Sequence, residues 1–336
     1  MSAGGLAADP RPTLVTGAGG FLGGHIARRL LAGGEAVRGL DLAWPEDTDA
    51  LSDKVTATIR DDEAVEHAVV GCKAVIHCVG LAHLWQPDPN AYRQVNVEGT
   101  SHVLAAAGRH GARVVNVSSY TTLIGRRSEG VLDETTVLPP TEMLGPYPAS
   151  KRHAELAVDQ AVAAGLWACS VLPSAPVGAS DHRLTPPSRM ILDLALGRTP
   201  ALLNCTLNLV DAAAVAASTI AARDRGRPGE RYLLSGEDLS MPTVAAAVAA
   251  LGGAPAPRPR VPFWVALAAA HVEAAVSGIT KRPPTAPLTG VRLAGRPVRF
   301  DASKAGNALG FSPRPLAEPL GEALAWMQAT GLISGG

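Results

Sequence analysis

Short apolar runs alternate with longer segments of helical periodicity through the first half of the chain. The apolar runs cover residues 13–16, 36–40, 55–59, 74–77 and 114–117, and the helical segments cover residues 21–32, 62–70, 91–110 and 148–164. Strands that alternate with helices in this way form crossover units, which build a parallel sheet. We therefore predict an α/β fold with a doubly wound parallel sheet.

After residue 172 the pattern becomes less regular. Prolines mark loops around residues 186–187, and short apolar runs return at 207–210 and 232–234. Alternating prolines over 255–262 favour an extended connector. We predict that residues 10–172 and 206–236 form the doubly wound domain. Residues 173–205 and 237–336 are expected to form a smaller C-terminal lobe.

Residues 263–276 are mostly apolar but include His271 and Glu273, and this run is too short to cross a bilayer. The pattern predicts a helix that is buried or lies at the surface. If the substrate is a lipid, peripheral contact of this helix with a membrane is an open alternative.

Charge and cysteine content exclude several classes of function. The 336 residues include 30 basic and 30 acidic side chains with no long run of either sign, which argues against a nucleic-acid partner and favours a small-molecule substrate. The four cysteines are scattered and have no histidine at metal-ligand spacing, so we predict reduced core thiols and no metal site. Residues 1–5 lack the pattern of a secretory signal, and we expect a cytoplasmic protein.

A glycine-rich loop, Thr-Gly-Ala-Gly-Gly-Phe-Leu-Gly, follows the first predicted strand and opens the first helix. Gly17, Gly20 and Gly23 allow a pyrophosphate to approach the backbone N–H groups, and the helix N-terminus adds a favourable dipole. Phe21 and Leu22 belong to the same loop. A plain strand-to-helix turn can share this spacing, but the order of strand, loop and helix favours a Rossmann-type dinucleotide site.

Asp41 ends the second predicted strand, about twenty residues after the loop, where a carboxylate can accept hydrogen bonds from the adenosine ribose. A 2′-phosphate would meet like charge there, so the residue favours NAD over NADP. Arg38 and Arg60 can still supply positive charge nearby, and Asp41 can instead be a turn residue. NADP is the less favoured alternative.

Tyr147 and Lys151 are four residues apart and share one face of the predicted helix that begins at Pro148. A neighbouring ammonium and a nicotinamide cation would both lower the pKa of the phenol, which could then move protons at neutral pH. Ser119 follows a strand, and its hydroxyl can hydrogen-bond a substrate oxygen; Ser118 is the competing candidate. The three residue types predict hydride transfer coupled to proton transfer by Tyr147.

Two further polar residues lie close to these positions in the predicted order of elements. The amide of Asn96 can hold backbone or water near the site, with an ordinary polar position on a helix face as the alternative. His77 ends the fourth strand and is expected to be an interior imidazole without a chemical role.

In combination these residues resemble the extended short-chain dehydrogenase/reductase superfamily, the NAD-dependent epimerase/dehydratases, over nearly the whole chain. A finer likeness is to the hopanoid-associated sugar epimerases, which are similar to dihydroflavonol 4-reductases. The segments that carry it are Leu84 to Pro89, Met143 to Tyr147, Pro173 to Gly178, Asn208 to Val210 and Gly229 to Tyr232.

The resemblance implies roles for particular residues. The glycines of the loop would bind the pyrophosphate, Asp41 the adenosine ribose, and Ser119, Tyr147 and Lys151 would form the catalytic triad. The residues implied to line the adenine and ribose side are Ile59, Cys78, Val79 and Gly80, and those implied to face the nicotinamide are Pro173 and Ser174. A homodimer packed through helices is also implied.

Several positions depart from the family's usual pattern, including Thr58, Asp41 and the alanines of residues 212–214. Thr58 occupies the place where a carboxylate often reaches the adenine amino group, which weakens that contact. Asp41 replaces the basic residue that reductase-like members often carry, which strengthens the preference for NAD.

We expect an NAD-dependent enzyme that acts on a secondary alcohol or ketone of a sugar or a polycyclic lipid, with the C-terminal lobe selecting the substrate. Net oxidation or reduction and epimerisation both stay open. The alternatives are an NADP-dependent ketone reductase of the dihydroflavonol-reductase type and a dinucleotide-sensing protein without catalysis.

Overall fold

A seven-stranded parallel sheet forms the centre of the first domain, in a computed structural model that describes residues 9–256 and 259–333. Its strands in spatial order are β11 (Arg231–Leu234), β7 (Ala168–Pro173), β5 (Arg113–Val117), β4 (Ala74–His77), β1 (Thr13–Thr16), β2 (Val37–Asp41) and β3 (Asp53–Thr56). Chain order reverses between β1 and β4, which is the Rossmann arrangement. The predicted fold class is confirmed.

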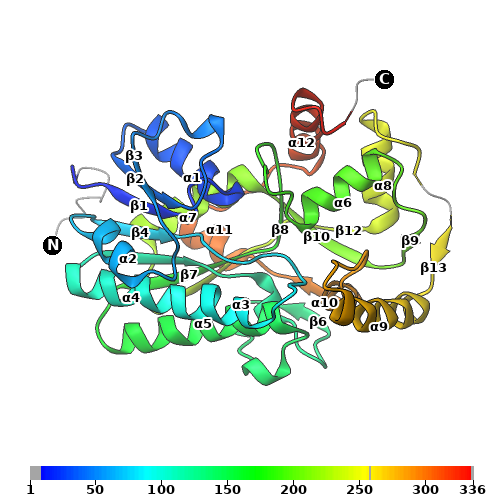
Figure 1. Cartoon of the computed structure of the whole chain (residues 1–336), viewed down its shortest axis with the longest axis horizontal. Coiled ribbons are helices and arrows are strands. Elements are labelled where there is room, and N and C mark those ends of the chain that lie inside the picture. The colour runs from blue at the N-terminus through cyan, green and yellow to red at the C-terminus, as the bar shows by residue number, and fades with distance from the viewer. Residues whose placement is uncertain (1–8, 257–258, 334–336) are drawn as a thin grey trace.

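Helices cover both faces of this sheet, which explains why β1, β4 and β7 are buried along their whole length. One face carries α1 (Phe21–Ala32), α7 (Ala212–Arg225) and α11 (Ser303–Leu309). The other carries α2 (Asp62–Val69), α4 (Gly99–His110) and α5 (Pro146–Ala163). Figure 1 shows the latter three side by side along their face.

The C-terminal lobe has its own small sheet and apolar core. The sheet contains β8 (Ala175–Val177), β10 (Thr206–Asp211) and β12 (Glu237–Ser240), and its helices are α6 (Pro186–Ala195), α8 (Met241–Ala250) and α12 (Ala317–Ala329). Figure 1 shows these elements beyond the carboxyl ends of the central strands. The lobe therefore faces the edge of the sheet where ligands bind in such folds.

The structure corrects the division of the chain between domain and lobe in two places. Residues 206–211 fall within the predicted first domain, but β10 pairs with β8 and β12 in the small sheet. Residues 303–311 fall within the predicted lobe, but Ala305, Leu309 and Phe311 pack into the core of the first domain. In both cases contacts between segments that are far apart in the sequence decide where the segment lies. The pattern of residues along the chain does not reveal such contacts.

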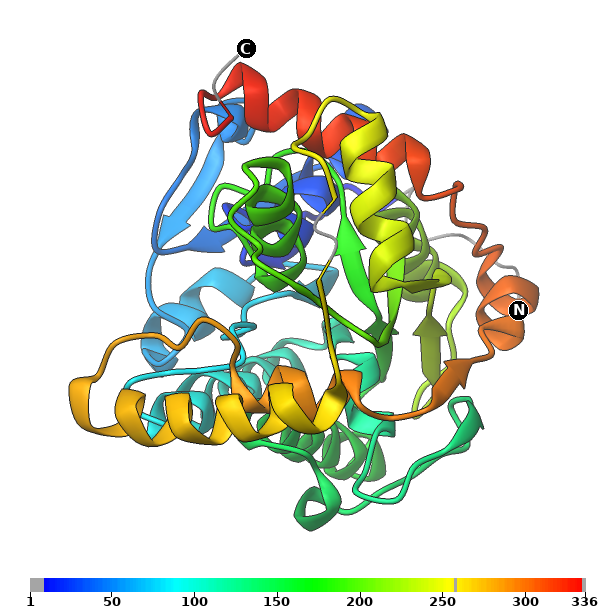
Figure 2. The same ribbon diagram turned by 90° about the vertical axis from the view of Figure 1, so that its right-hand side faces the viewer.

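Several further strands and helices complete this part of the structure. They are β9 (Leu202–Leu203) paired with β13 (Arg260–Val261), α9 (Phe263–Thr280), α10 (Leu288–Ala294), and β14 (Val298–Phe300) paired with β6 (Gly130–Leu132). Figure 2 shows α9 lying along the outer edge of the molecule. The helix has 18 residues and extends beyond the predicted run, so by length and composition alone it could span a membrane, and the expectation from residues 263–276 that it is too short is wrong in that respect.

Two helices differ from their predicted bounds. α5 begins at Pro146 and contains Tyr147, two residues before the predicted start at Pro148. Both prolines fit in the first turn, where backbone N–H groups have no helical partners. The predicted helix at 91–110 divides into α3 (Asn90–Tyr92), a π-helical segment η3 (Arg93–Glu98) and α4. Such π-helical turns are frequent at functional sites, and this one contains Asn96.

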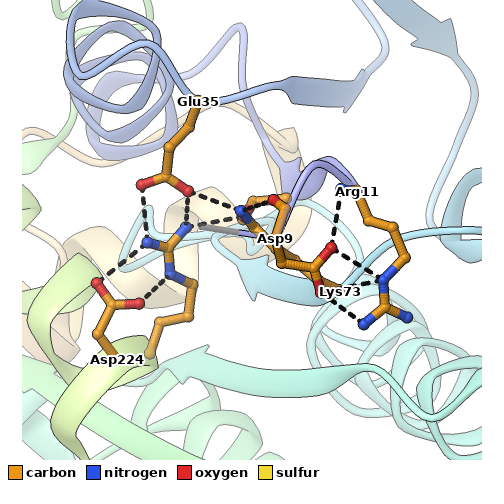
Figure 3. Close-up of polar contacts among 7 residues, drawn as sticks. Asp9, Arg11, Glu35, Lys73 and Asp224 are labelled. Atoms are coloured by element: carbon orange, nitrogen blue, oxygen red, sulfur yellow. Dashed lines mark hydrogen bonds and ion pairs between the residues drawn. The ribbon is translucent and has the colours of Figure 1, made fainter. Parts of the chain in front are cut away.

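A buried ion-pair network closes the amino ends of the strands, opposite the ligand-binding edge. Arg223, at the end of α7, is fully buried and donates to both carboxylate oxygens of Glu35 (2.8 and 2.9 Å) and to Thr13 (2.8 Å). Lys73 lies 3.1 Å from Glu35 and donates to the carbonyl of Asp9 (2.9 Å). In Figure 3, dashed lines join the carboxylate of Glu35 to the basic side chains of this network. The pairing satisfies charges that would otherwise be costly to bury.

Candidate active site

A cavity of about 470 Å³ lies at the carboxyl ends of the central strands, against the lobe. This size is typical of small-molecule sites. The sequence-predicted residues that line it are Gly17, Gly20, Phe21, Leu22, Gly23, Asp41, Ile59, Cys78, Val79, Gly80, Ser119, Tyr147, Lys151, Pro173 and Ser174. Asn96 is buried behind the wall.

The glycine loop is so tightly wound that side chains are excluded from it. Gly17 has a φ of +75°, and a Cβ on Gly23 would lie 1.9 Å from the carbonyl oxygen of Gly17. A Cβ on Gly17 would also lie 3.1 Å from the backbone nitrogen of Val79. The loop thus packs against the start of α1 and against the segment after β4, and it leaves its backbone open toward the cavity.

Asp41 is buried at the end of β2 and accepts three hydrogen bonds. Two come from the backbone N–H groups of Gly19 (3.1 Å) and Leu42 (2.7 Å). The third comes from the guanidinium of Arg183 (2.5 Å), a residue of the lobe. The carboxylate is therefore held in place by the glycine loop, and it also links the lobe to the first domain.

Tyr147, Ser119 and Lys151 converge on one wall of the cavity and are all buried. Burial raises the pKa of Tyr147, and a hydrogen bond with the Ser119 side chain acts in the opposite direction. Burial also lowers the pKa of Lys151 to about 8, although Cys78 and Glu155 oppose that change. The lowering of the Tyr147 pKa that we expected from Lys151 is thus not found in the chain by itself.

The Lys151 ammonium is held by the end of β5 and by the chain after β4. Its Nζ donates to the carbonyl of Val117 (2.9 Å). A Cβ on Gly80 would lie 2.9 Å from the same Nζ, so glycine is needed there for the lysine to reach its position. Burial of the ammonium in this narrow space is the physical cause of its lowered pKa.

The two adjacent serines have different partners. Ser118 donates to the buried carboxylate of Glu155, one helical turn after Lys151 on α5. That carboxylate also accepts from Thr122 (2.8 Å) and pairs with Arg152 (3.2 Å). Ser119 instead accepts a hydrogen bond from the Thr121 hydroxyl (2.9 Å), and it is the side chain that acts to lower the pKa of Tyr147. The geometry favours Ser119 as the hydroxyl available to a substrate.

Asn96 connects the loop after β4 to α5. Its Oδ1 accepts from the backbone N–H of Leu81 (2.8 Å), and its Nδ2 donates to the hydroxyl of Ser150 (2.8 Å). Ser150 directly precedes Lys151 on the helix, so this bridge helps to position the wall formed by Ser119, Tyr147 and Lys151, and Asn96 itself does not line the cavity.

His77 is buried between two threonine hydroxyls, Thr16 (2.8 Å) and Thr100 (3.0 Å). Burial, together with the charge of Lys151, lowers the pKa of His77 to about 3. The imidazole is therefore neutral at physiological pH and satisfied inside the domain, as expected for a residue without a chemical role.

The residues around the groove fit a bound dinucleotide. The hydroxyl of Ser174 is buried in the cavity wall and has no hydrogen-bond partner among the described residues. Buried polar groups are rarely left unpaired, so such a hydroxyl points to a ligand. The open glycine loop and the ordered Asp41 carboxylate lie on the same cavity.

The model of the NAD dependent epimerase/dehydratase family matches residues 13–216, which include the glycine loop, Asp41 and the Ser119, Tyr147 and Lys151 wall. The chain belongs to this family. Its members and relatives make it an oxidoreductase or epimerase of the extended short-chain dehydrogenase/reductase type.

Relatives of this epimerase/dehydratase span nearly its full length. A candidate dihydroflavonol 4-reductase from Synechocystis sp. is 33% identical over 95% of both chains. Sterol demethylase protein B from Methylococcus capsulatus is 31% identical over 96% of this chain and 99% of its own. The structure of a dTDP-glucose 4,6-dehydratase from Streptomyces venezuelae with NAD bound, at 24% identity, covers 94% and 96% with a TM-score of 0.75, which shows the shared fold.

Sequence reasoning missed several residues of the site of this family member. Arg183 lies in a lobe loop with no motif, and its contact with Asp41 spans 142 positions. Glu155 repeats the four-residue spacing of Tyr147 and Lys151, which is a signal that could have placed it on the same helix face. Arg296 and the apolar wall beside it come from the end of the lobe and carry no local signature.

Proposed function

We propose that the protein is an NAD-dependent oxidoreductase that interconverts a ketone and a secondary alcohol on an apolar, polycyclic lipid-like substrate. The observation that carries this proposal is the composition of the cavity beside Ser119 and Tyr147. Its apolar lining on the substrate side consists of Leu84, Ile124, Met190, Leu207, Leu209, Leu293, Val298 and Phe300.

The charges around the cavity argue against a nucleotide-sugar as the preferred substrate. Three of the described lining residues are cationic, and two of these have other partners: Lys151 donates to Val117, and Arg183 pairs with Asp41. Arg296 is the third, and its Nε is buried and has no partner among the described residues. A diphosphate is usually bound by several charge-assisted hydrogen bonds, whereas one guanidinium suits a single polar group on an apolar molecule.

The residues that would hold the cofactor line the cavity at the carboxyl ends of the central strands. The glycine loop offers its backbone to the pyrophosphate, Asp41 its carboxylate to the adenosine ribose, and Ser174 its free hydroxyl to the nicotinamide amide. NAD supplies the hydride acceptor when bound. Buried Asp41 supports NAD rather than NADP, because a 2′-phosphate there would meet a carboxylate.

Within this proposal Tyr147 donates a proton to the substrate oxygen in reduction and removes it in oxidation. Ser119 donates a hydrogen bond to the same oxygen and stabilises charge that develops there. Lys151, charged and next to the site, stabilises the phenolate that forms at Tyr147. Because burial raises the pKa of the phenol, the positive charge of Lys151 is needed for proton transfer by Tyr147 near neutral pH.

A Tyr147→Phe variant tests the proposal. With NADH and apolar cyclic ketones as substrates, wild type should change the absorbance of NADH stoichiometrically, and the variant should lower kcat about 100-fold or more. NAD affinity measured by fluorescence titration should change little. Equal activity of the two proteins would refute the proton-transfer role, and turnover of nucleotide-sugars alone would refute the substrate class.

Epimerisation is the second reaction that this site can support, because the chain belongs to a family that includes epimerases. Tightly held NAD after purification, together with turnover that needs no added cofactor, would identify it. Release of product with stoichiometric consumption of NADH identifies net redox.

A further inference from the structure

Helix α9 exposes one continuous apolar face. Trp264 is 72% exposed, Val272 65% and Ile279 84%, and Val276 is also exposed. With 100° between successive residues, these side chains and the exposed alanines between them cover an arc of about 140°, within an exposed arc of about 200° that also includes His271, Gly278 and Thr280. Large apolar side chains that gather on one face mark an interaction surface rather than scattered exposure.

The opposite side of α9 is occupied by the protein. Ala270 and Ser277 are buried there, and the ring of Phe263 packs so closely on Gly295, just after α10, that a Cβ would lie 2.2 Å from it. Glu273, at the edge of the exposed arc, accepts a hydrogen bond from the backbone N–H of Ala286 (3.1 Å). The fold thus fixes the orientation of the helix and leaves its apolar side outward.

The charges at the two ends of this face have one sign. The exposed arc contains His271 and Thr280 as its polar side chains and has no acidic residue. Arg260 lies just before the helix, and Lys281 and Arg282 follow it; all three are exposed and form no ion pair with the residues that the structure describes. The face is therefore apolar along its length and basic at both ends.

We propose that α9 docks on an anionic lipid bilayer, lying flat at the level of the headgroups. Apolar side chains would enter the boundary of the acyl chains, Trp264 would sit at the interface, and the terminal basic residues would contact lipid phosphates. The helix does not span, because the side packed on α10 cannot be surrounded by lipid.

Charge favours a bilayer over a second copy of the chain as the occupant of this face. In a two-fold pairing of α9 with itself, an antiparallel arrangement would bring Arg260 of one copy against Lys281 and Arg282 of the other. A parallel arrangement would bring like ends together. Both arrangements place basic residues against basic residues, whereas an anionic membrane is complementary to both ends.

The docked orientation has a consequence for the substrate, which rests on the proposed function. α10 packs on α9 and contributes Gly290, Leu293 and Ala294 to the cavity. A membrane bound to α9 would therefore lie one helix away from the apolar half of the cavity. A lipid ketone could then enter the site from the bilayer.

Vesicle co-sedimentation of the full chain tests the surface without reference to catalysis. The vesicles are phosphatidylcholine with and without phosphatidylglycerol. Wild type should bind the anionic vesicles, and combining Trp264→Gln, Val272→Gln and Ile279→Gln should reduce partitioning about 100-fold or more. Combining Arg260→Gln, Lys281→Gln and Arg282→Gln should reduce partitioning onto the anionic vesicles about 100-fold and should leave partitioning onto pure phosphatidylcholine vesicles unchanged.

The matched control replaces two apolar side chains that are equally exposed elsewhere. Val131 is 67% exposed and Val137 62%. The variant with both changed to Gln should bind vesicles like wild type. Because all substituted residues are exposed, circular dichroism should report an unchanged fold for each variant.

Three outcomes would overturn the docking proposal: no binding of wild type to anionic vesicles, equal binding by the apolar variant, or self-association that the apolar variant abolishes in the absence of lipid. Activity on a short, water-soluble ketone is measured in parallel. If the protein turns over the ketone but does not bind vesicles, the docking proposal alone is refuted. If it binds vesicles but does not turn over the ketone, the proposed function alone is refuted.

Discussion

The guanidinium of Arg183 contacts the carboxylate of Asp41 at 2.5 Å, and this ion pair joins the C-terminal lobe to the end of β2. Asp41 is buried, whereas half of the Arg183 side chain is exposed. The arginine belongs to a loop in which Ser180 and Leu184 both have positive φ values. This conformation is uncommon for residues other than glycine, so contacts such as the ion pair between Arg183 and Asp41 are needed to hold the loop in place at the cavity.

This pairing predicts how cofactor preference can be changed. Asp41→Asn should raise the KM for NAD about 10-fold to 100-fold, because charge-assisted hydrogen bonds to the ribose are lost. The preference should shift toward NADP, since the repulsive carboxylate is gone and Arg183 can pair with a 2′-phosphate. Adding Arg183→Gln should abolish the gain with NADP and leave the loss with NAD. Steady-state kinetics with both cofactors measures this, and an unchanged KM for NAD in Asp41→Asn would contradict the role of the carboxylate.

Two adjacent glycines of α1 should respond differently to alanine. In Gly23→Ala the new Cβ would lie 1.9 Å from the Gly17 carbonyl, so the loop must open and NAD affinity should fall at least about 100-fold. In Gly24→Ala the nearest atom is the flexible end of Arg28 at 3.3 Å. This control should bind NAD normally and be stabilised by up to about 1 kcal/mol, because alanine is the better helix former. Calorimetric titration with NAD and urea unfolding distinguish the two outcomes.

The lowered pKa of Lys151 predicts an alkaline limit to ketone reduction. An amine with a pKa of about 8 is charged below that pH and loses its charge as the pH rises through it. With saturating NADH, kcat/KM for the ketone should therefore be level below pH 8 and fall above it. Lys151→Arg keeps the charge, so the activity that this variant retains should begin to fall only at a higher pH than in wild type. Lys151→Met should be slow at every pH, and a wild-type profile with no fall above pH 8 would argue against a requirement for the ammonium.

The network around Arg223 should contribute to stability and not to catalysis. Arg223→Met leaves the partly buried Glu35 with Lys73 but without its bidentate partner, and should lower the free energy of unfolding by about 3 kcal/mol. Arg11→Met removes the exposed pair with Asp9, which Figure 3 shows beside the network, and should leave the unfolding midpoint unchanged. Both variants should keep the wild-type kcat/KM, since the network lies at the far end of the strands. Urea unfolding followed by assay at low temperature provides both readouts.

Local features of the site were readable from the sequence because the chemistry depends on neighbours along the chain. The strand, loop and helix around Gly17 to Gly23 follow one another directly, and Tyr147 and Lys151 are one helical turn apart. The choice between Ser118 and Ser119 was not readable. Both serines follow β5. The distinction comes from Glu155, which lies 37 residues after Ser118 and accepts a hydrogen bond from the Ser118 hydroxyl.

The sequence by itself determined the fold class, the family and many of the residues that line the cavity, because periodicity and short motifs encode secondary structure and local geometry. Only the tertiary structure decided that β10 joins the small sheet, that Arg183 reaches Asp41, and that α9 turns an apolar face outward. Each of these depends on which distant segment occupies a given side of an element. Such choices are made by packing across the whole chain, and no window of neighbouring residues contains them.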